Sequence, residues 1–448
     1  MSTNVTVRIP PSPTGRLHIG TARTALFNYL FARHADGRIV FRSEDTDRTR
    51  SKREHEDEIV EGLHWLGLDW DDFSRQSEHA ARHTELLDGL IRAEKAFVSK
   101  EPAKDDPSRE VEVVRLKNPG RAITFTDEIR GEITFDTTEL GDFVIARSRD
   151  DALYHFAVVA DDWDAGVTHV IRGEDHISNT PRQILIQEAL GAPRPVYAHI
   201  PLILDAKRAK LSKRSGATSV MDYRAEGFLP EALVNYFALL GWNPGSDRED
   251  FSLAELVEAF SLAGVQKSGA AFDREKLLSV NQRWMRKLSD EAYVSHLNDL
   301  DPELDLSNIG KIVPLLKERA RTFGEAREML GGELAFLFAP PSVSKEALLA
   351  KTPAGRGAEV QRALERALEA LAGLGSEIAA NSAKDALMPI AEELEAVGKG
   401  SRGAFLWSLR YALSGSERSP DPFTIIYILG ADEALSRLRH ALALLGAS

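Results

Sequence analysis

Apolar residues follow two different spacings along the chain. In the first part they form short runs, as in Val5, Val7 and Ile9, which occupy alternate positions and predict a strand with one buried face. Further apolar runs at 39–41 and 170–171 predict more strands, and strand-like and helical segments alternate until about residue 205. Beyond about residue 205 the pattern becomes mostly helical. This order favours an α/β domain followed by an α-rich half.

Helix signals are explicit in the second half of the chain. Pro230 precedes an amphipathic pattern that closes at Gly241, and proline at a helix start with glycine past its end is the usual asymmetry. Residues 253–260 predict a second helix, and the Ala- and Leu-rich stretches 360–374 and 434–445 predict packed helices. No repeat of fixed period is present.

A segment of mixed character interrupts the strand pattern between about residues 74 and 167. It combines a helical stretch at 79–96, a polar linker at 100–109 and strands at 111–116 and 143–147. Sequential strands of one sheet rarely have so much material between them. We therefore predict a domain inserted into the α/β domain.

The segment after the first strand has the features of a phosphate site. Prolines at 10, 11 and 13 stop strand pairing, and Gly15 lets the chain turn. Helical spacing of apolar residues begins after His18, so His18 and the amides around Gly20 are expected near a helix N-terminus. Unpaired N–H groups and the helix dipole attract phosphate there. His18 could instead be a helix cap or a buried structural residue.

Three further charged motifs also follow predicted strands. They are Glu44-Asp45-Thr46-Asp47, Arg172-Gly173-Glu174-Asp175-His176 and Lys210-Leu211-Ser212-Lys213-Arg214. In an open parallel sheet, ligands bind beyond the carboxyl ends of the strands, so all four motifs are expected to converge on one crevice. Asp47 has an alternative role as the cap of a helix that begins near Thr49.

Composition narrows the classes of protein. With 448 residues, two to four domains are expected. The absence of cysteine excludes disulfides, thiolate zinc sites and a cysteine nucleophile. No apolar stretch is long enough to span a membrane, and we expect a soluble cytoplasmic protein. The net charge of -13 means that a nucleic-acid partner requires local basic patches, for which 207–214 and 283–287 are candidates, although the second group could be a solvated face.

Together these motifs resemble those of bacterial-type glutamyl-tRNA synthetases, which are class I aminoacyl-tRNA synthetases. The resemblance is strong up to about Trp284 and looser beyond it. It is carried by Arg8 to Asn28, Glu44 to Arg48, Tyr154 to Asp164, Thr168 to Gln183, Tyr197 to Ile200, Lys210 to Tyr223 and Gly227 to Trp242.

The resemblance implies a domain organisation. A Rossmann-like parallel-sheet catalytic domain would occupy 1–73 and 168–205, interrupted by an acceptor-end-binding α/β domain at 74–167. A stem-contact region at 206–290 and an all-α anticodon-binding domain at 291–448 would follow. Some relatives carry a cysteine-rich zinc knob in the insertion, whereas this chain runs from Ala96 to Glu101 into a short linker, so no zinc is expected.

The resemblance also implies the reaction and the residues that carry it. The enzyme would use ATP with Mg²⁺ to form glutamyl-adenylate, then transfer glutamate to the terminal adenosine of tRNA. His18, Lys210 and Lys213 would be catalytic, and Arg8, Ser12, Glu44, Tyr154 and Arg172 would bind glutamate, with no protein metal site. ATP would contact Pro11, Thr14, Gly15, His18, Gly20, Thr21, Lys210, Ser212 and Lys213. The partners would be the glutamate tRNA and possibly the glutamine tRNA, and the protein would be a monomer.

Other interpretations differ in identifiable features. A glutaminyl-tRNA synthetase shares the architecture but typically ends in β-barrels, and the paralogue that glutamylates a modified tRNA base is shorter. A catalytically silent RNA-binding paralogue would not need intact His18, Lys210 and Lys213, and a nucleotidyltransferase would not need the long helical half. Pro10 stands where an alanine is common in the family and Ser43 where an aliphatic residue is common.

Overall fold

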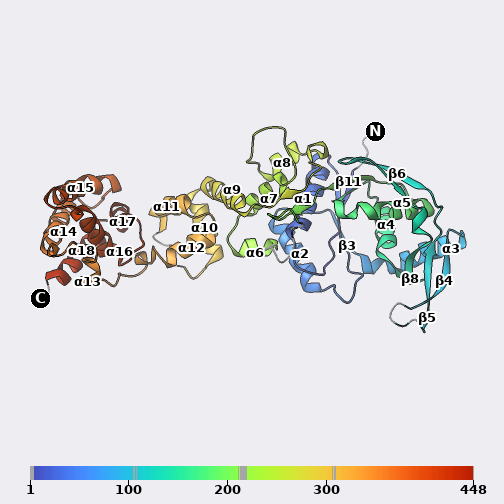
Figure 1. The fold of residues 1–448 in the computed structure, drawn as a ribbon, viewed down its shortest axis with the longest axis horizontal. Helices are drawn as coiled ribbons and strands as arrows, with labels where there is room; N and C mark the ends of the chain where they lie inside the picture. Colours follow the sequence, from blue (N-terminus) through green and yellow to red (C-terminus); the bar gives the residue numbers. More distant parts are fainter. Residues whose placement is uncertain are drawn as a thin grey trace. The chain divides into compact units, whose positions relative to one another are not determined.

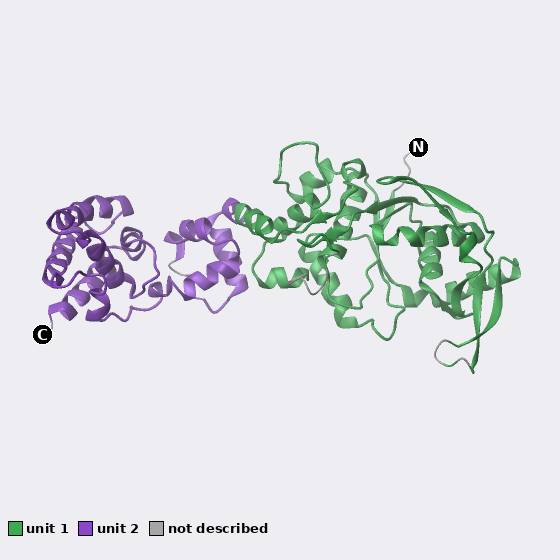
Figure 2. Cartoon of the chain, in the orientation of Figure 1, with its two compact units in different colours: residues 1–284 green, residues 285–448 purple. Residues whose placement is uncertain are grey.

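The computed structural model describes residues 5–103, 106, 108–209, 211, 219–304, 306 and 309–446. They form two compact units, Met1–Trp284 and Met285–Ser448 (Figure 2). Within these ranges, none of the helices combines the length and the apolar character that a membrane span requires.

The first unit opens with a parallel three-stranded sheet in the order β1-β2-β3 (Figure 1). Its strands are β1 (Thr6–Ile9), β2 (Arg38–Ser43) and β3 (Asp72–Arg75). The alternating pattern at β1 predicted one buried face, but all four residues are buried, including the polar Thr6 and Arg8. The prediction was wrong because a parallel sheet is covered on both faces, so even its polar positions lie inside.

A second sheet lies beside the first. It has the order β10-β11-β6-β7, in which β10 and β11 are parallel. Thr168, just before β10, binds the backbone of Thr6 in both directions, with two N···O distances of 2.9 Å. The strands are β10 (His169–Gly173), β11 (Val196–Ile200), β6 (Ala122–Asp127) and β7 (Gly131–Asp136).

The insertion contributes the β6-β7 hairpin and an antiparallel sheet in the order β4-β5-β8-β9. That sheet consists of β4 (Ala96–Pro102), β5 (Glu110–Leu116), β8 (Phe143–Ser148) and β9 (Asp151–Ala152). One apolar core joins Val114 and Phe156 of the insertion to Ile184 and Tyr197 that follow it. The insertion is therefore packed continuously with the parallel strands, and the limits 74 and 167 stay predictions.

Helices cover the sheets and complete the first unit. Helix α1 packs against β1, β2 and β10 and also contacts α7 and α8. The helices are α1 (Ile19–His34), α2 (Arg53–Trp65), η1 (Gln76–His79), α3 (Ala80–Arg92), η2 (Thr138–Leu140), α4 (Tyr154–Asp164), η3 (Glu174–Asn179), α5 (Thr180–Leu190), α6 (Val220–Ala225), α7 (Pro230–Leu239), α8 (Leu253–Ala259), η4 (Leu262–Gly264) and α9 (Arg274–Lys287), with a short pair β12 (Ile203–Leu204) and β13 (Ala270–Ala271).

The second unit is helical throughout its described residues, which confirms the predicted α-rich half. Its apolar stripes face one another, as in α14, where Val360, Leu364 and Leu371 are buried. The elements are α10 (Asp290–Leu300), η5 (Ile309–Lys311), α11 (Val313–Arg319), α12 (Phe323–Gly331), η6 (Ala335–Leu337), α13 (Lys345–Leu348), α14 (Gly357–Ala372), α15 (Ala380–Val397), α16 (Ser401–Ser414), α17 (Pro422–Leu429) and α18 (Ala431–Gly446). The predicted boundary at residue 291 stays a prediction.

Candidate functional site

A cavity of about 420 Å³ lies at the carboxyl ends of β1, β10 and β11. Its lining includes Arg8, His18, Arg172 and Asp175 together with Leu211. Residues from three of the four charged motifs therefore meet here, as expected for loops that follow parallel strands.

A second cavity, of about 850 Å³, shares Ser12 with the first. It is lined by Thr14, Glu44 and Tyr154, among others. The residues predicted to bind one ligand are thus divided: Arg8 and Arg172 line the smaller cavity, whereas Glu44 and Tyr154 line the larger one. Pro11, Gly20 and Thr21 line the smaller cavity, and Gly15 lines neither.

His18 is the N-cap of α1, and its ring Nδ1 accepts a hydrogen bond from the Gly20 amide at 3.1 Å. An acceptor nitrogen carries no proton, so a neutral His18 ring has its proton on Nε2. The capping role and the phosphate role considered for His18 are therefore compatible. The cap uses Nδ1, and the Nε2–H can donate to a ligand oxygen.

Leu211 lines the smaller cavity together with His18, and Ser219, the next described residue along the chain, pairs with His18. Leu211 is buried and its amide donates to the Ile203 carbonyl at 2.9 Å. Ser219 forms an isolated antiparallel bridge with His18, and the Val220 amide donates to the Leu17 carbonyl at 3.0 Å. Lys210, Ser212 and Lys213 themselves lie outside the described residues.

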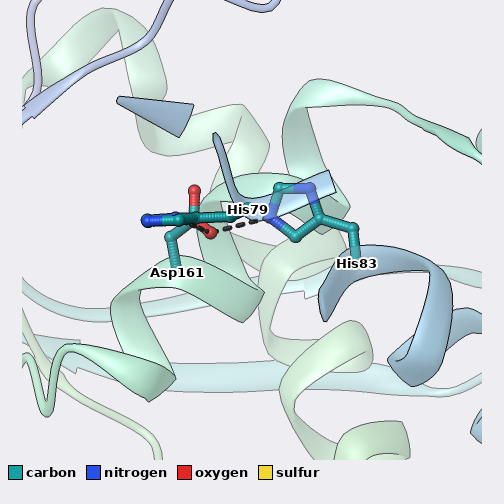
Figure 3. A group of neighbouring side chains, drawn as sticks. All are labelled: His79, His83 and Asp161. Carbon is teal, nitrogen blue, oxygen red and sulfur yellow. Dashed lines mark hydrogen bonds and ion pairs between the residues drawn. The ribbon is translucent and has the colours of Figure 1, made fainter. Parts of the chain in front are cut away.

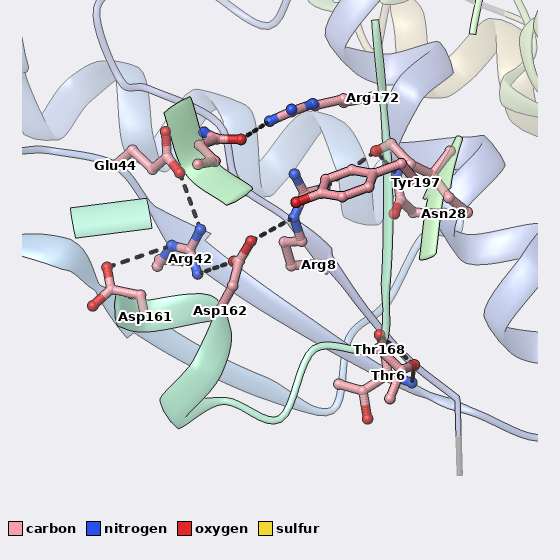
Figure 4. Close-up of polar contacts among 12 residues, drawn as sticks. Thr6, Arg8, Asn28, Arg42, Glu44, Asp161, Asp162, Thr168, Arg172 and Tyr197 are labelled. Atoms are coloured by element: carbon pink, nitrogen blue, oxygen red, sulfur yellow. Dashed lines mark hydrogen bonds and ion pairs between the residues drawn. The ribbon is translucent and has the colours of Figure 1, made fainter. Parts of the chain in front are cut away.

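Arg172 (Figure 4) is a buried arginine whose hydrogen-bond acceptors among the described residues are all uncharged. Its Nη1 donates to Gln183 Oε1 at 2.7 Å, its Nη2 to Thr180 Oγ1 at 2.8 Å, and its Nε to His199 Nε2 at 3.1 Å. Burial, together with the nearby positive charge of Arg8, lowers the pKa of Arg172. Asp162 is near enough to oppose this shift, but a buried cation that has no carboxylate among its hydrogen-bond partners is costly unless a ligand supplies negative charge.

Arg8 lies near Arg172 but has an acidic partner. Its Nε contacts Asp162 Oδ2 at 3.4 Å, and its Nη1 donates to the Ile171 carbonyl at 3.1 Å. Asn28 of α1 donates to the same carbonyl at 3.1 Å. Arg8 is therefore held rigidly at the cavity wall with part of its charge balanced.

Arg42 connects three acids in the interior and was not singled out from the sequence (Figure 4). Its Nη1 donates to Asp162 at 2.7 Å and its Nη2 to Glu44 at 3.2 Å, and its Nε lies 3.7 Å from Asp161. Although burial opposes the charged form, the surrounding carboxylates raise the pKa of Arg42. One oxygen of Glu44 is thereby committed to Arg42, and burial raises the pKa of Glu44.

His79, His83 and Asp161 form a cluster whose ligand-type atoms lie within 4.8 Å of one another (Figure 3). Asp161 Oδ1 lies 2.9 Å from His79 Nδ1 and 2.7 Å from His83 Nε2, and Gln76 donates to Oδ2 at 2.8 Å. Burial opposes the charge of Asp161, but these histidine contacts and Arg42 lower the pKa of Asp161. Because Arg42 already balances this carboxylate, we interpret the cluster as a hydrogen-bond network and not as a metal centre.

The charged motif after β2 differs from its prediction at one point. Asp47 Oδ1 accepts from the amides of Thr49 and Arg50, at 3.2 and 3.3 Å, so it caps a turn. Helix α2 begins only at Arg53, with Lys52 as its N-cap. The predicted cap of a helix near Thr49 was wrong because a hydrogen-bonded turn at 47–51 precedes the helix.

Glu174 also has a clear structural role that the sequence left open. Its Oε1 accepts from the Leu202 amide at 2.8 Å, and its Oε2 accepts from Arg130 at 2.5 Å. It therefore ties the end of β10 to the turn after β11 and to the β6-β7 hairpin. The sequence interpretation missed several residues of the site, among them Arg42 and His199. Both stand inside apolar runs, and a charged or polar aromatic residue within such a run could have indicated them.

Comparisons with known proteins agree with the geometry. The chain matches a family model described as tRNA synthetases class I (E and Q), catalytic domain, over residues 4–105 and 99–279, and an anticodon binding domain over 275–442. A glutamate–tRNA ligase 2 of Coxiella burnetii is 39% identical over 472 aligned positions, which cover 98% of each chain.

Two solved structures are similar over nearly the whole length. One is a glutamate tRNA ligase from Elizabethkingia meningosepticum in complex with its amino acid, with a TM-score of 0.85, 29% identity and coverage of 99% of this chain and 100% of that one. The other is a glutamate-tRNA synthetase from Elizabethkingia anophelis, with a TM-score of 0.82, 28% identity and coverage of 98% and 100%.

Replacing Arg42 by methionine is expected to destabilise the first unit strongly. The substitution leaves Glu44, Asp161 and Asp162 buried without their shared cation, and breaking a buried pair in this way costs about 3–5 kcal/mol. The matched control is Arg38→Met on the same strand, whose partner Asp72 is exposed, with an expected cost below about 1 kcal/mol. Urea unfolding measures the free energy of unfolding of both variants. Equal losses in the two variants would contradict the stabilising role of the Arg42 ion pairs.

His79 is expected to make stability depend on pH. The hydrogen bond to Asp161 raises the pKa of His79 in the folded protein, so the folded state binds the proton more tightly than the unfolded chain. This contribution is present below the unfolded pKa and is lost as the pH rises through the folded pKa. In urea unfolding, His79→Gln should therefore cost more at pH 6 than at pH 9. His34→Gln, at a ring that contacts a backbone carbonyl, serves as the control, and a pH-independent cost of His79→Gln would refute the assignment.

Proposed function

The chain belongs to the class I tRNA synthetases for glutamate and glutamine, and from this premise we propose that it is a glutamate–tRNA ligase with Arg8 and Arg172 as the anchors for the substrate's side-chain carboxylate. The observation that carries the assignment is the buried Arg172, whose Nε, Nη1 and Nη2 each donate to a neutral acceptor. A side-chain carboxylate supplies the missing negative charge, whereas the neutral amide of glutamine does not.

The reaction has two displacements. An oxygen of the glutamate α-carboxylate attacks the α-phosphorus of ATP, and the bond to the leaving pyrophosphate breaks. A ribose hydroxyl of the terminal adenosine of tRNA then attacks the acyl carbon of glutamyl-adenylate, loses its proton and releases AMP. No covalent link to the protein forms, so the residues of the site position the reactants and balance charge.

The phosphate side of the site is formed by the start of α1. The His18 Nε2–H and the amides near Gly20 provide donors, and the dipole of α1 provides positive potential. We assign Lys210 and Lys213 as further donors, since Leu211, which stands between them in the sequence, lines this cavity, and Ser219 pairs with His18. Pro11, Thr14, Gly15, Thr21 and Ser212 complete the proposed ATP contacts.

Glutamate is held between the two cavities. Ser12 lines both of them and is placed to contact the amino acid, with Arg8 and Arg172 on one side and Glu44 and Tyr154 on the other. The oxygen of Glu44 that does not bind Arg42 is the acceptor that we assign to the substrate ammonium group. Opposite charges at the two ends of the pocket thus orient an amino acid with an acidic side chain.

We include Mg²⁺ as the companion of ATP. The smaller cavity has Asp175 as the carboxylate among its described lining, and Mg²⁺ is commonly held by one or two carboxylates together with substrate phosphates. The residues present therefore fit such an ion, which would neutralise phosphate charge. The monomeric state, a cytoplasmic location, charging of the glutamine tRNA and a need for tRNA in the first step stay predictions.

Aminoacylation tests the function directly. The purified protein would be given ATP, Mg²⁺ and labelled glutamate or glutamine with separate transcripts of the glutamate and glutamine tRNAs. We expect glutamate on the glutamate tRNA, and glutamate on both transcripts would indicate relaxed tRNA choice. Transfer of glutamine would favour the glutaminyl enzyme, against which the helical second unit argues. Charging of neither tRNA would favour the silent RNA-binding paralogue.

Replacing Arg172 by methionine should raise the KM for glutamate by about 100-fold, equivalent to about 3 kcal/mol for removing one partner of a buried charge pair. The KM for ATP should change far less. Arg194→Ala, which removes an exposed arginine paired with Glu188, is the control and should leave both values unchanged. An unaltered KM for glutamate in Arg172→Met would remove Arg172 from the amino-acid pocket.

Two substitutions at His18 separate its cap from its proposed chemistry. Asparagine caps helices well, so His18→Asn retains an acceptor for the Gly20 amide but loses the Nε2–H donor. We expect the rate of adenylate formation, measured by ATP–pyrophosphate exchange, to fall about 10²- to 10³-fold with little change in thermal stability. His18→Ala should show the same kinetic loss plus about 1 kcal/mol of destabilisation. A wild-type rate of ATP–pyrophosphate exchange in His18→Asn would show that His18 acts only as a helix cap.

A further inference from the structure

Asp127, His199 and Arg172 form a line of buried polar groups that ends at the smaller cavity. His199 Nδ1 lies 2.6 Å from Asp127 Oδ2, and Arg172 Nε donates to His199 Nε2 at 3.1 Å. The exposed fractions are 1% for Asp127, 0% for His199 and 5% for Arg172. Burial at this level shields the hydrogen bonds among the three side chains from bulk solvent.

The protonation of His199 follows from its two partners. A guanidinium N–H can only donate, so Nε2 must accept and the ring proton must be on Nδ1, which donates to Asp127. A doubly protonated ring would direct a second N–H at Arg172. Burial lowers the pKa of His199, and Arg172 and Arg8 act in the same direction, whereas the hydrogen bond from His199 to Asp127 opposes them. The other groups that face the ring are Tyr197 and the Thr180 hydroxyl.

Asp127 is itself fixed by backbone donors. It ends β6, and its Oδ1 accepts from the amides of Ile129 and Arg130 at 3.0 and 2.8 Å. The His199 amide donates to its Oδ2 at 3.1 Å. The carboxylate that selects the His199 tautomer is therefore held by the turn between β6 and β7 and by β11.

We propose that His199, oriented by Asp127, is a positioning residue that aims the Arg172 guanidinium at the substrate carboxylate through a neutral acceptor. The inference rests on the proposed function and adds a residue pair to it. Were the acceptor at this position a carboxylate, Arg172 would already be neutralised, and the substrate would have to compete with an internal ion pair. A neutral imidazole fixes the direction of Nε and leaves the positive charge for the ligand.

Asp127→Asn tests this arrangement with little disturbance of the turn. The asparagine oxygen can keep the bonds to the Ile129 and Arg130 amides and can also accept from the His199 amide, which lies 3.3 Å from Oδ1, but its NH₂ group would face His199 Nδ1. His199 would then accept on Nδ1 and carry its proton on Nε2, against Arg172. The matched control is Asp136→Asn at the end of β7, where Oδ1 likewise accepts from the amide two residues further on, that of Thr138, at 2.9 Å, just before η2.

We expect the KM for glutamate to rise about 10- to 100-fold in Asp127→Asn, the range typical of removing an outer hydrogen-bond partner. The kcat at saturating glutamate and the KM for ATP should stay within about twofold of wild type, as should all constants of Asp136→Asn. His199→Gln, whose side-chain oxygen can still accept from Arg172, should lose less than His199→Leu, which has no acceptor. The same KM for glutamate in Asp127→Asn and wild type would overturn the proposal.

The tautomer gives a readout that does not depend on activity. Correlation of ring nitrogens with carbon-bound protons in ¹⁵N-histidine-labelled protein distinguishes Nδ1–H from Nε2–H, and the missing signal in His199→Gln identifies the residue among the 12 histidines. We expect the Nδ1–H form in wild type. If His199 of the wild-type protein carried its proton on Nε2, or were charged, the proposed positioning of Arg172 by His199 would be refuted even if the enzyme charges tRNA. An Nδ1–H ring in a protein that charges no tRNA would instead contradict the proposed function.

Discussion

The structure of the site depends on a buried chain of alternating charges that runs from Asp161 through Arg42 and Asp162 to Arg8 (Figure 4). Each ion would be very costly in the interior alone, and each is stabilised because its neighbours have the opposite sign. The arginines stand on the adjacent parallel strands β1 and β2, and both acids stand on α4. These ion pairs therefore hold α4 against the sheet. In doing so they also fix residues that line both cavities.

The charges of the neighbouring groups also distinguish the two arginines of the smaller cavity. Arg8 has Asp162 as a neighbour, whereas Arg172 is surrounded by a hydroxyl, an amide oxygen and an imidazole nitrogen. Of the two, Arg172 has the greater unbalanced charge, and Arg8 adds to the positive potential around it. A pocket with this imbalance favours an anion over a neutral isostere. The preference arises from what surrounds the arginines as much as from the arginines themselves.

The sequence predicted the elements that local pattern determines. The strand at Thr6–Ile9, the helix that starts after His18 and the helical second half follow from alternation, proline placement and apolar spacing. The burial of Arg8 and Arg42 does not follow from such patterns. A charged residue within a strand is predicted to face solvent unless it is known which helices or strands cover that face of the sheet. The roles of His199 and Asp127 are likewise set by partners 27 and 72 residues away in the chain. Tertiary contacts of this range leave no periodic trace in the sequence.

Arg8 and the His199 partner of Arg172 each contact an acid from the segment that interrupts the parallel strands. Asp162 stands on α4 and Asp127 at the end of β6, and both elements fall within the predicted insertion at 74–167. The shared apolar core, which includes Phe156 and Tyr197, holds these elements against β10 and β11. The segment therefore completes the electrostatics of the smaller cavity, because it supplies the acids closest to Arg8 and to His199. A rearrangement of α4 would move Asp162 and so act on Arg8 directly, and a rearrangement of the β6-β7 hairpin would move Asp127 and so act on Arg172 through His199.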